Sequence, residues 1–297
     1  MFIRYQGNLF LEIKDIVDWN GAKMLVEIVL FFLIMIVLYL LIIMPKLKAN
    51  PQLEKFDGWL YAHRGLHDNK TRAPENSLAA FSLAVEKGFG IELDVQLTKD
   101  LVPVVHHDYK LKRSCKVNKK ISELTYQELR KYKIFGSEEK IPTLEEVLET
   151  VDKKVPLIIE LKIPWKPNHT CEAVSKVLAN YQGLYCIESF NPFGLIWYKK
   201  HFPHVVRGQL STDFIKEKIK GSKVQYFILK HLLLNFLTKP DFIAYHHVYR
   251  RGLSFTICRK LYRTKTFAWT IESQEQLEDN QGYFDLFIFD SFIPEKK

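Results

Sequence analysis

The sequence predicts a TIM (β/α)8 barrel preceded by one N-terminal transmembrane helix. Beyond residue 58, eight short apolar runs alternate with segments of helical pattern, which is the arrangement of strands and connecting helices in such a barrel. Before them, residues 24–44 form an almost uninterrupted apolar run. A doubly wound open sheet is the alternative architecture, but no glycine-rich phosphate loop supports it.

The apolar run is expected to cross a membrane as an uncleaved helix. Its 21 residues carry one charge, Glu27, and at about 1.5 Å each they span the roughly 30 Å hydrocarbon core. No small-residue cleavage site follows it, which disfavours a signal peptide. Residues 1–23 are expected to form an interfacial helix. We therefore divide the chain into an N-terminal segment with its anchor, residues 1–49, and a catalytic domain, residues 50–297.

Charge indicates which partners suit the protein. The 297-residue chain is 47% hydrophobic and has a formal net charge of +9, which suits anionic partners such as membrane headgroups. No nucleic-acid motif appears, so no nucleic-acid partner is expected. Lysines flank both ends of the apolar run, and the positive-inside tendency leans toward a single-pass cell-membrane protein with a cytoplasmic domain. Four cysteines without metal-type spacing are expected to be free thiols. The sequence leaves the oligomeric state open.

The barrel elements follow from the alternation of patterns. The run 102–108 is expected as an extra strand that folds back on 90–95, because residues 98–100 are a turn signal. Residues whose numbers sum to about 201 would then face each other, which brings His107 near Asp94. A helix is also expected at 125–132. The barrel strands are expected at 59–64, 90–95, 156–162, 184–190, 205–211, 241–246, 266–271 and 285–290, and the helices at 76–88, 143–152, 169–182, 193–202, 212–237, 250–263 and 273–280.

Carboxylates at strand ends predict a cation site. Glu92 and Asp94 alternate with apolar residues, so on a strand both point to one face, where their charges repel. A solvent-exposed polar face would explain that pair alone. Glu160, at the end of a third apolar run, adds another carboxylate. Because carboxyl ends of parallel strands meet at one barrel mouth, we expect the three to bind one divalent cation, Mg²⁺ or Ca²⁺.

The order of polar motifs resembles the glycerophosphodiester phosphodiesterase family, in particular membrane-anchored bacterial members. The resemblance covers roughly residues 59–293, including Ser189-Phe190 and Ala268-Trp269-Thr270. One departure is the closing motif, where the family has Asp-Gly-Ile-Ile-Thr-Asp and this chain has residues 285–290 as DLFIFD. The motifs that carry the resemblance are His63-Arg64-Gly65, Pro74-Glu75-Asn76, Glu92-Leu93-Asp94-Val95, His107-Asp108 and Glu160-Leu161-Lys162.

Residue types and resemblance together assign the site. Imidazoles titrate near neutrality, so His63 and His107 are expected as acid and base. Metal ligands are expected at Glu92, Asp94 and Glu160. Contacts to the phosphate or the rest of the substrate are expected from Arg64, Lys162 and Trp269. Glu75 and Asn76 are further possible site residues, Glu75 either as a metal ligand or in another role at the site.

The implied reaction is metal-dependent hydrolysis of a glycerophosphodiester to glycerol 3-phosphate and an alcohol. The resemblance implies attack by the substrate's own glycerol hydroxyl, giving a cyclic phosphate that water then opens. The substrate would be a small-molecule or lipid-derived diester. The alternatives are a related barrel phospholipase, either a phosphatidylinositol-type lyase or a lysophospholipase D, and a membrane-anchored binding protein with a vestigial site.

Overall fold

A computed structural model describes residues 3–48, 50–164 and 167–295, with side chains from Gly21 onward. The chain forms two compact units, Met1–Ile43 and Met44–Lys297, and each is described by itself. The boundary between them lies six residues before the one expected from sequence, which followed residue 49.

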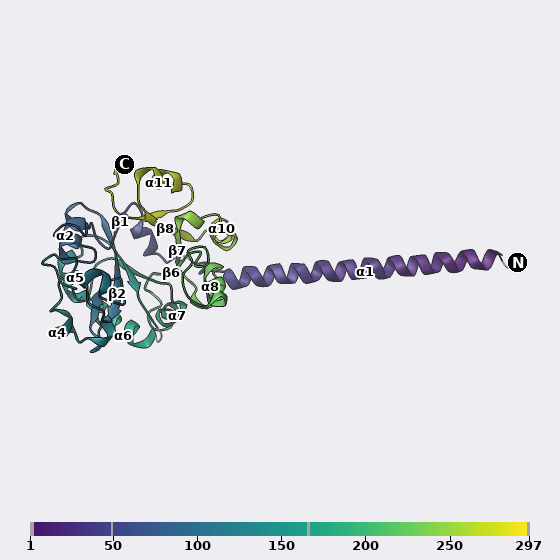
Figure 1. The fold of residues 1–297 in the computed structure, drawn as a ribbon. Helices are drawn as coiled ribbons and strands as arrows, with labels where there is room; N and C mark the ends of the chain where they lie inside the picture. The colour runs from purple at the N-terminus through teal and green to yellow at the C-terminus, as the bar shows by residue number, and fades with distance from the viewer. Residues whose placement is uncertain (1–2, 49, 165–166, 296–297) are drawn as a thin grey trace. The chain divides into compact units, whose positions relative to one another are not determined.

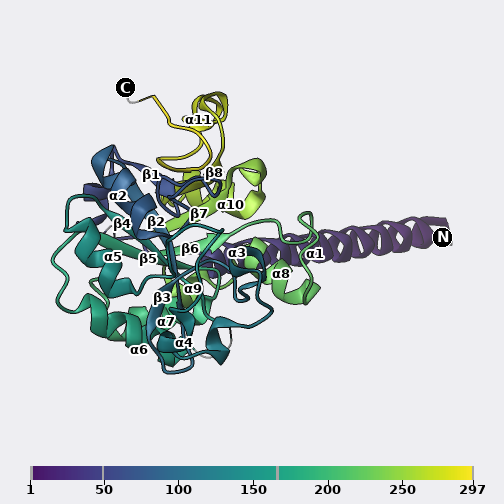
Figure 2. The same ribbon diagram turned by 60° about the vertical axis from the view of Figure 1, so that its left-hand side comes forward.

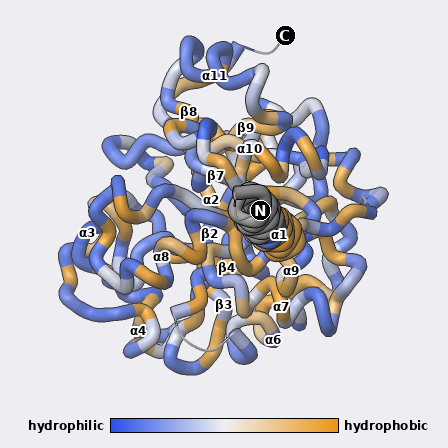
Figure 3. The backbone as a smooth tube through the Cα atoms, turned by 90° about the vertical axis from the view of Figure 1, so that its right-hand side faces the viewer, coloured by the Kyte–Doolittle hydropathy of each residue, from blue (hydrophilic) through white to orange (hydrophobic). Residues whose placement is uncertain are grey.

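The first unit is one helix, α1 (Ile3–Ile43), of 41 residues. The interfacial helix expected over 1–23 and the span expected over 24–44 are therefore continuous. An 18-residue window within Gly21–Ile43 has a mean hydropathy of 3.2, and this part of the tube is apolar in Figure 3. A helix of this length and composition is able to cross a membrane, although a signal sequence passes the same test.

The second unit is the expected closed barrel of eight parallel strands (Figures 1 and 2). The strands follow one another around the barrel in the order β1-β9-β8-β7-β6-β5-β4-β2, and pairing between β1 and β2 closes it. The short strand β3 (Pro103–Val105) pairs antiparallel with β2, as the hairpin prediction required. The barrel strands are β1 (Leu60–His63), β2 (Gly90–Leu97), β4 (Leu157–Leu161), β5 (Tyr185–Ser189), β6 (Arg207–Ser211), β7 (Phe242–His246), β8 (Lys265–Ile271) and β9 (Leu286–Phe289).

The barrel interior changes from apolar to polar along the strands. Three aromatic rings stack in the apolar core of the barrel. Tyr61 and Phe267 have ring centroids 6.3 Å apart, and Phe267 and Phe242 have ring centroids 4.0 Å apart. Side chains alternate along a strand, so the residue two positions beyond a core residue faces the same way. Cys186 and Ile158 belong to this core, and the positions two residues beyond them are carboxylates. The apolar layer thus supports a polar layer above it.

Helices surround the barrel, and most begin at a side-chain cap. Ser77, Thr143, Asn191 and Ser273 each accept a hydrogen bond from a backbone N–H in the first turn of the helix that follows. The helix expected at 125–132 is only one turn long. The helices are α2 (Leu78–Glu86), α3 (Lys112–Cys115), α4 (Tyr126–Leu129), α5 (Leu144–Val151), α6 (Pro167–Leu178), α7 (Pro192–His201), α8 (Lys223–Lys230), α9 (Asn235–Thr238), α10 (Leu253–Lys260) and α11 (Gln274–Asn280), with 3-10 turns at Leu53–Phe56, Ile121–Glu123 and His247–Tyr249.

The prediction of a single helix over residues 212–237 is wrong. The chain first forms turns and bends through residues 212–222, and α8 begins only where Ser222 caps it. Leu232, with a φ of 55°, then separates α8 from α9. Left-handed backbone at a leucine interrupts a right-handed helix, so this connection is an irregular excursion between β6 and β7.

The first residues of the second unit are fastened to the segment before β7. The Lys46 backbone N–H donates to the Pro240 carbonyl at 3.2 Å, and the Lys46 ammonium lies 2.7 Å from the buried Asp241 carboxylate. Lys239 donates to the Met44 carbonyl at 3.2 Å. These bonds fix residues 44–46 beside the end of α9.

Candidate active site

His63 ends β1 and is held by a carboxylate from the end of the chain. Its Nδ1 lies 2.7 Å from Asp290 Oδ2, and its Nε2 lies 3.8 Å from Glu92 Oε2. Burial lowers the pKa of His63, and the Asp290 hydrogen bond opposes this effect. Asp290 therefore fixes the ring so that Nε2 faces the carboxylates of the mouth. Asp290 is the last residue of the closing motif DLFIFD, and no role was expected for it from the sequence.

His107 reaches the mouth although the hairpin register differs from expectation. Paired residues of β2 and β3 sum to 200, as in Val95 and Val105, and the His106 amide donates to the Asp94 carbonyl at 2.9 Å. The ladder ends there, so strict alternation no longer governs the next residue. The ring of His106 hydrogen-bonds to Ser114, whereas the charge of His107 acts on Asp94 and Glu160.

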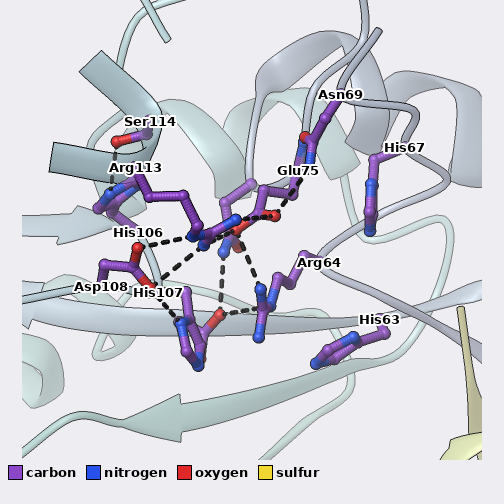
Figure 4. Close-up of polar contacts among 12 residues, drawn as sticks. His63, Arg64, His67, Asn69, Glu75, His106, His107, Asp108, Arg113 and Ser114 are labelled. Atoms are coloured by element: carbon purple, nitrogen blue, oxygen red, sulfur yellow. Dashed lines mark hydrogen bonds and ion pairs between the residues drawn. The ribbon is translucent and has the colours of Figure 1, made fainter. Parts of the chain in front are cut away.

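The second histidine is held in the same manner as the first. His107 Nδ1 lies 2.7 Å from Oδ1 of its neighbour Asp108. The Asp108 carboxylate is itself bound by Arg113, whose Nε is 2.7 Å away. Figure 4 shows the rings of His63 and His107 on either side of the Arg64 guanidinium. Two imidazoles, each oriented through Nδ1 by a carboxylate, thus approach the mouth from different elements.

Glu92, Asp94 and Glu160 come together as the sequence predicts. Ligand oxygens of the three carboxylates all lie within 4.8 Å of one another, and all three side chains are buried. Burial raises the pKa of Glu92, and the charges of Asp94 and Glu160 raise it further. Three oxygen donors that repel one another in a water-poor site fit a hard divalent cation, which prefers carboxylate ligands.

Two cations face this cluster. Lys162 Nζ lies 3.0 Å from both Asp94 Oδ1 and Glu160 Oε1, and Arg64 Nε lies 3.3 Å from Asp94 Oδ2. The Arg64 backbone N–H also donates to Glu92 at 3.2 Å. Burial works to lower the pKa of Lys162, but Asp94 and Glu160 raise it overall, so its ammonium keeps its charge. Both groups are available to contact an anionic phosphoryl group.

A fourth buried carboxylate, Glu188, was missed in the sequence. It pairs in register with Glu160 on the neighbouring strand, and its Oε2 has no hydrogen-bond partner among the described residues. Burial raises the pKa of Glu188, as do the charges of Glu160 and Asp94. The signal that could have identified Glu188 is the same alternation that identified Glu92 and Asp94. Glu188 stands two residues beyond Cys186, so on a strand both side chains point to the same face. Four carboxylates against Lys162 and Arg64 leave an excess that a divalent cation would balance.

Glu75 and Asn76 support the site from the loop before α2. Asn76 Nδ2 donates to Asp94 Oδ2 at 2.9 Å. Glu75 instead binds two arginines, at 3.0 Å to Arg64 and 2.6 Å to Arg113 (Figure 4). In the part of the chain that the structure describes, Glu75 lies outside the three-carboxylate group. Glu75 thus contacts Arg64 and Arg113 instead of joining the cluster, and Arg113 was not singled out in the sequence.

Acid is expected to destabilise the fold through Glu75. Burial alone would raise the pKa of Glu75, but hydrogen bonds from Arg113 and the charge of Arg64 lower it from 4.5 to about 2. A lowered folded-state pKa stabilises the protein above pH 4.5, and this contribution is lost as the pH falls toward 2. The loss is on the order of 2–3 kcal/mol. Urea unfolding of Glu75→Gln and wild type across this range measures it.

The matched control is Glu149→Gln, which makes the same change at an exposed position on α5. Glu75→Gln should lower the unfolding free energy at neutral pH and flatten its acid dependence, while Glu149→Gln should do neither. Equal acid dependence in wild type and Glu75→Gln contradicts the assignment.

Trp269 belongs to an aromatic wall on the far side of the mouth. Its ring packs edge-on against Phe190 at 5.6 Å and His246 at 4.9 Å. A cavity of about 870 Å³ opens between Phe190 and the cluster. Its lining joins site residues to a basic rim: His107, Asp108, Tyr109, Lys110, Lys112, Arg113, Glu160, Leu161, Lys162, Ile163, Ser189, Phe190 and Asn191.

Comparison with known proteins assigns the family. Residues 63–283 match the model of the glycerophosphoryl diester phosphodiesterase family. The chain belongs to this family. A glycerophosphodiester phosphodiesterase of Caldanaerobacter subterraneus subsp. tengcongensis is 32% identical over 231 residues, which cover 73% of this chain and 87% of the relative. The protein is accordingly a phosphoric diester hydrolase, and its barrel is the barrel of this family.

Solved structures of the family superpose on the barrel. An Oleispira antarctica phosphodiesterase in complex with the product sn-glycerol-3-phosphate has a TM-score of 0.65 at 27% identity, covering 79% of this chain and 94% of that one. A Thermotoga maritima glycerophosphodiester phosphodiesterase has a TM-score of 0.60 at 25% identity, covering 78% and 94%. A lysophospholipase D of Rattus norvegicus is 34% identical over 157 residues, about half of each chain.

Proposed function

We propose that this phosphodiesterase cleaves glycerophosphodiesters to glycerol 3-phosphate and an alcohol, with His63 and His107 as acid and base and one Mg²⁺ or Ca²⁺ bound. The observation that carries the proposal is the arrangement of two carboxylate-held histidines around one buried acidic cluster. The relative bound to sn-glycerol-3-phosphate supports the product class.

Each charged group has a distinct task. Glu92, Asp94 and Glu160 would hold the cation, which when bound polarises phosphoryl oxygens and neutralises developing charge. Arg64 and Lys162 bind the phosphoryl oxygens and fix their orientation. Asp290 and Asp108 are positioning residues, because each holds a histidine through Nδ1 and leaves Nε2 to exchange protons.

The reaction proceeds in two displacements at phosphorus. One histidine removes the proton from the neighbouring glycerol hydroxyl, whose oxygen forms a bond to phosphorus. The bond from phosphorus to the alcohol oxygen breaks, and the other histidine protonates that oxygen. Water then adds to the cyclic phosphate with the proton transfers reversed, which opens the ring to glycerol 3-phosphate.

The first test is an assay of diester cleavage with and without EDTA, followed by identification of the products. We expect metal-dependent release of glycerol 3-phosphate. Accumulation of a cyclic phosphate as the final product would instead identify a lyase. Release of a lysophosphatidic acid from a lysophospholipid would identify lysophospholipase D activity. The rat relative and the large cavity beside Phe190 favour this alternative. Absence of turnover on all diesters would favour a vestigial site.

We further propose that α1 anchors the enzyme in the cell membrane as a single span and that the remaining chain folds alone. Residues 44–46 bond to the barrel, so the soluble form should begin at Met44. Deleting residues 1–43 is expected to leave kcat on a water-soluble diester within about twofold, because every proposed site residue lies beyond residue 60.

Deleting residues 1–49 removes Lys46 and leaves the Asp241 carboxylate, whose side chain is fully buried, without its ammonium partner. We expect a further loss of about 1–3 kcal/mol in unfolding free energy relative to the 44–297 form. Urea unfolding of both forms measures it. Aggregation of the 44–297 form would show that the barrel requires α1.

A further inference from the structure

We propose that the excursion of residues 212–238, between β6 and β7, docks on the surface of the anionic bilayer that holds α1. This inference rests on the proposed membrane anchoring and adds a second, surface contact to it. Ordinary solvent-facing connections are polar, whereas this one combines exposed large apolar side chains with lysines.

Several large apolar side chains of the excursion are exposed to solvent. Val224 and Phe227 are 70% and 51% exposed, and their spacing of three residues puts both on one face of α8. Ile215 and Ile219 are each 44% exposed in the segment before α8, and Phe236 is 42% exposed in α9. Five large apolar side chains are thus exposed within one connection, and a concentration of exposed apolar side chains is typical of an interaction surface.

The lysines of the excursion identify the partner. Five lysines stand in residues 212–238 against Asp213 and Glu217. Lys218, Lys220 and Lys223 are exposed and form no ion pair among the described residues. Apolar side chains interleaved with unpaired lysines fit the interface of a bilayer that carries anionic headgroups. A protein partner would require a second folded surface of complementary shape, to which nothing here points.

The tether brings this excursion to the bilayer. The chain leaves the apolar helix at Ile43, and the next residues are bonded to Lys239, Pro240 and Asp241, directly after α9. A membrane that contains residues 21–43 therefore begins within a few residues of the excursion's end. The excursion needs no further segment to reach the headgroups.

The same excursion borders the mouth of the barrel. Phe214 packs against Phe190 at 5.7 Å, and Phe190 lines the large cavity. Phe214 also stacks on Tyr226 of α8 at 5.0 Å. Docking through α8 would hold the mouth next to the surface from which a lipid-derived diester emerges, so it should affect capture of such substrates and leave the chemistry unchanged.

The direct test is a fluorescence measurement on the full chain in phosphatidylcholine–phosphatidylglycerol nanodiscs that hold one copy each. An environment-sensitive nitrobenzoxadiazole probe is attached to Phe227→Cys in a Cys115→Ser background, since the other three cysteines are buried. We expect a blue shift and quenching by doxyl-labelled lipids. The control is Leu83→Cys on α2, which lies on the opposite side of the barrel from α8 (Figure 1).

Unquenched emission at residue 227 equal to that at residue 83 would overturn docking, even where the nanodisc retains the protein and α1 is thereby shown to anchor it. A blue shift that depends on having two copies per disc, without lipid quenching, would overturn it in favour of self-association. Failure of the full chain to enter nanodiscs would instead refute the anchoring on which the inference rests.

A second measurement separates capture from chemistry. Val224→Glu with Phe227→Glu should lower turnover of a diester embedded in the same membrane about tenfold, because burying these side chains drives docking. Turnover of a water-soluble diester should not change, and Leu83→Glu should alter neither rate. Equal loss on both diesters would indicate damage to the barrel and overturn the assignment.

Discussion

Replacing Glu160 by glutamine is expected to lower kcat at least about 10³-fold, and removing divalent cations with EDTA should have a similar effect. The physical reason is the acidic cluster. Its three carboxylates have oxygens within 4.8 Å of one another, and burial and mutual repulsion raise the pKa of Glu92 and Glu160. Replacing one charged carboxylate by a neutral amide weakens cation binding and leaves the phosphoryl charge poorly compensated.

The measurement combines turnover with the affinity for Mg²⁺ or Ca²⁺, determined by calorimetry. Weakened cation binding in a variant that remains folded would indicate loss of a ligand and not a general structural defect. Glu149→Gln makes the same chemical change on the exposed surface of α5 and should leave both quantities unchanged. Glu188→Gln removes the unpaired fourth carboxylate and tests whether it contributes to binding. Full turnover of Glu160→Gln in EDTA would contradict the metal assignment.

His63→Ala and His107→Ala are each expected to lower kcat by about 10²–10⁴-fold with little change in stability. Each imidazole is oriented at 2.7 Å by its own carboxylate, so neither ring is able to take over the other's geometry. His201→Ala is the control, because that histidine is exposed on α7. Turnover and circular dichroism of the three variants provide the comparison.

The positioning residues refine this test. Asp290→Asn and Asp108→Asn should reduce kcat less than loss of the histidines, and each should shift the pH profile of kcat/KM, because the partner imidazole loses a negative neighbour. A purely structural role would alter stability without moving the profile. Near-wild-type turnover of either alanine variant would remove that histidine from the mechanism.

The barrel and its acidic cluster were predictable because they depend on local patterns. Alternation placed Glu92 and Asp94 on one face of a strand, Glu160 stood at the end of another apolar run, and the barrel rule brought the strand ends together. The support of His63 was not predictable in the same way, since Asp290 lies 227 residues away and reaches it only through the pairing of β1 with β9. Arg113 lies in a lysine-rich segment whose pattern does not distinguish one basic residue from the next.

Local conformation accounts for the other differences. The expected helix over 212–237 has a continuous helical pattern in sequence, but left-handed backbone at Leu232 and the cap at Ser222 divide it. The predicted hairpin register differs from the observed one by one residue. The turn was located from residue preferences, and these specify a turn better than the pairing that follows. His107 nevertheless reaches the mouth because the ladder ends before it.

The proposed reacting groups come from one continuous arc of the barrel. β1, β2 and β4 are neighbours in the sheet, and with the β3 hairpin they supply both histidines, the cation ligands and Lys162. The strands β6, β7 and β8 across the barrel supply aromatic side chains and irregular connections instead. Sequence change in the second arc would therefore leave the proposed reacting groups of the first arc in place.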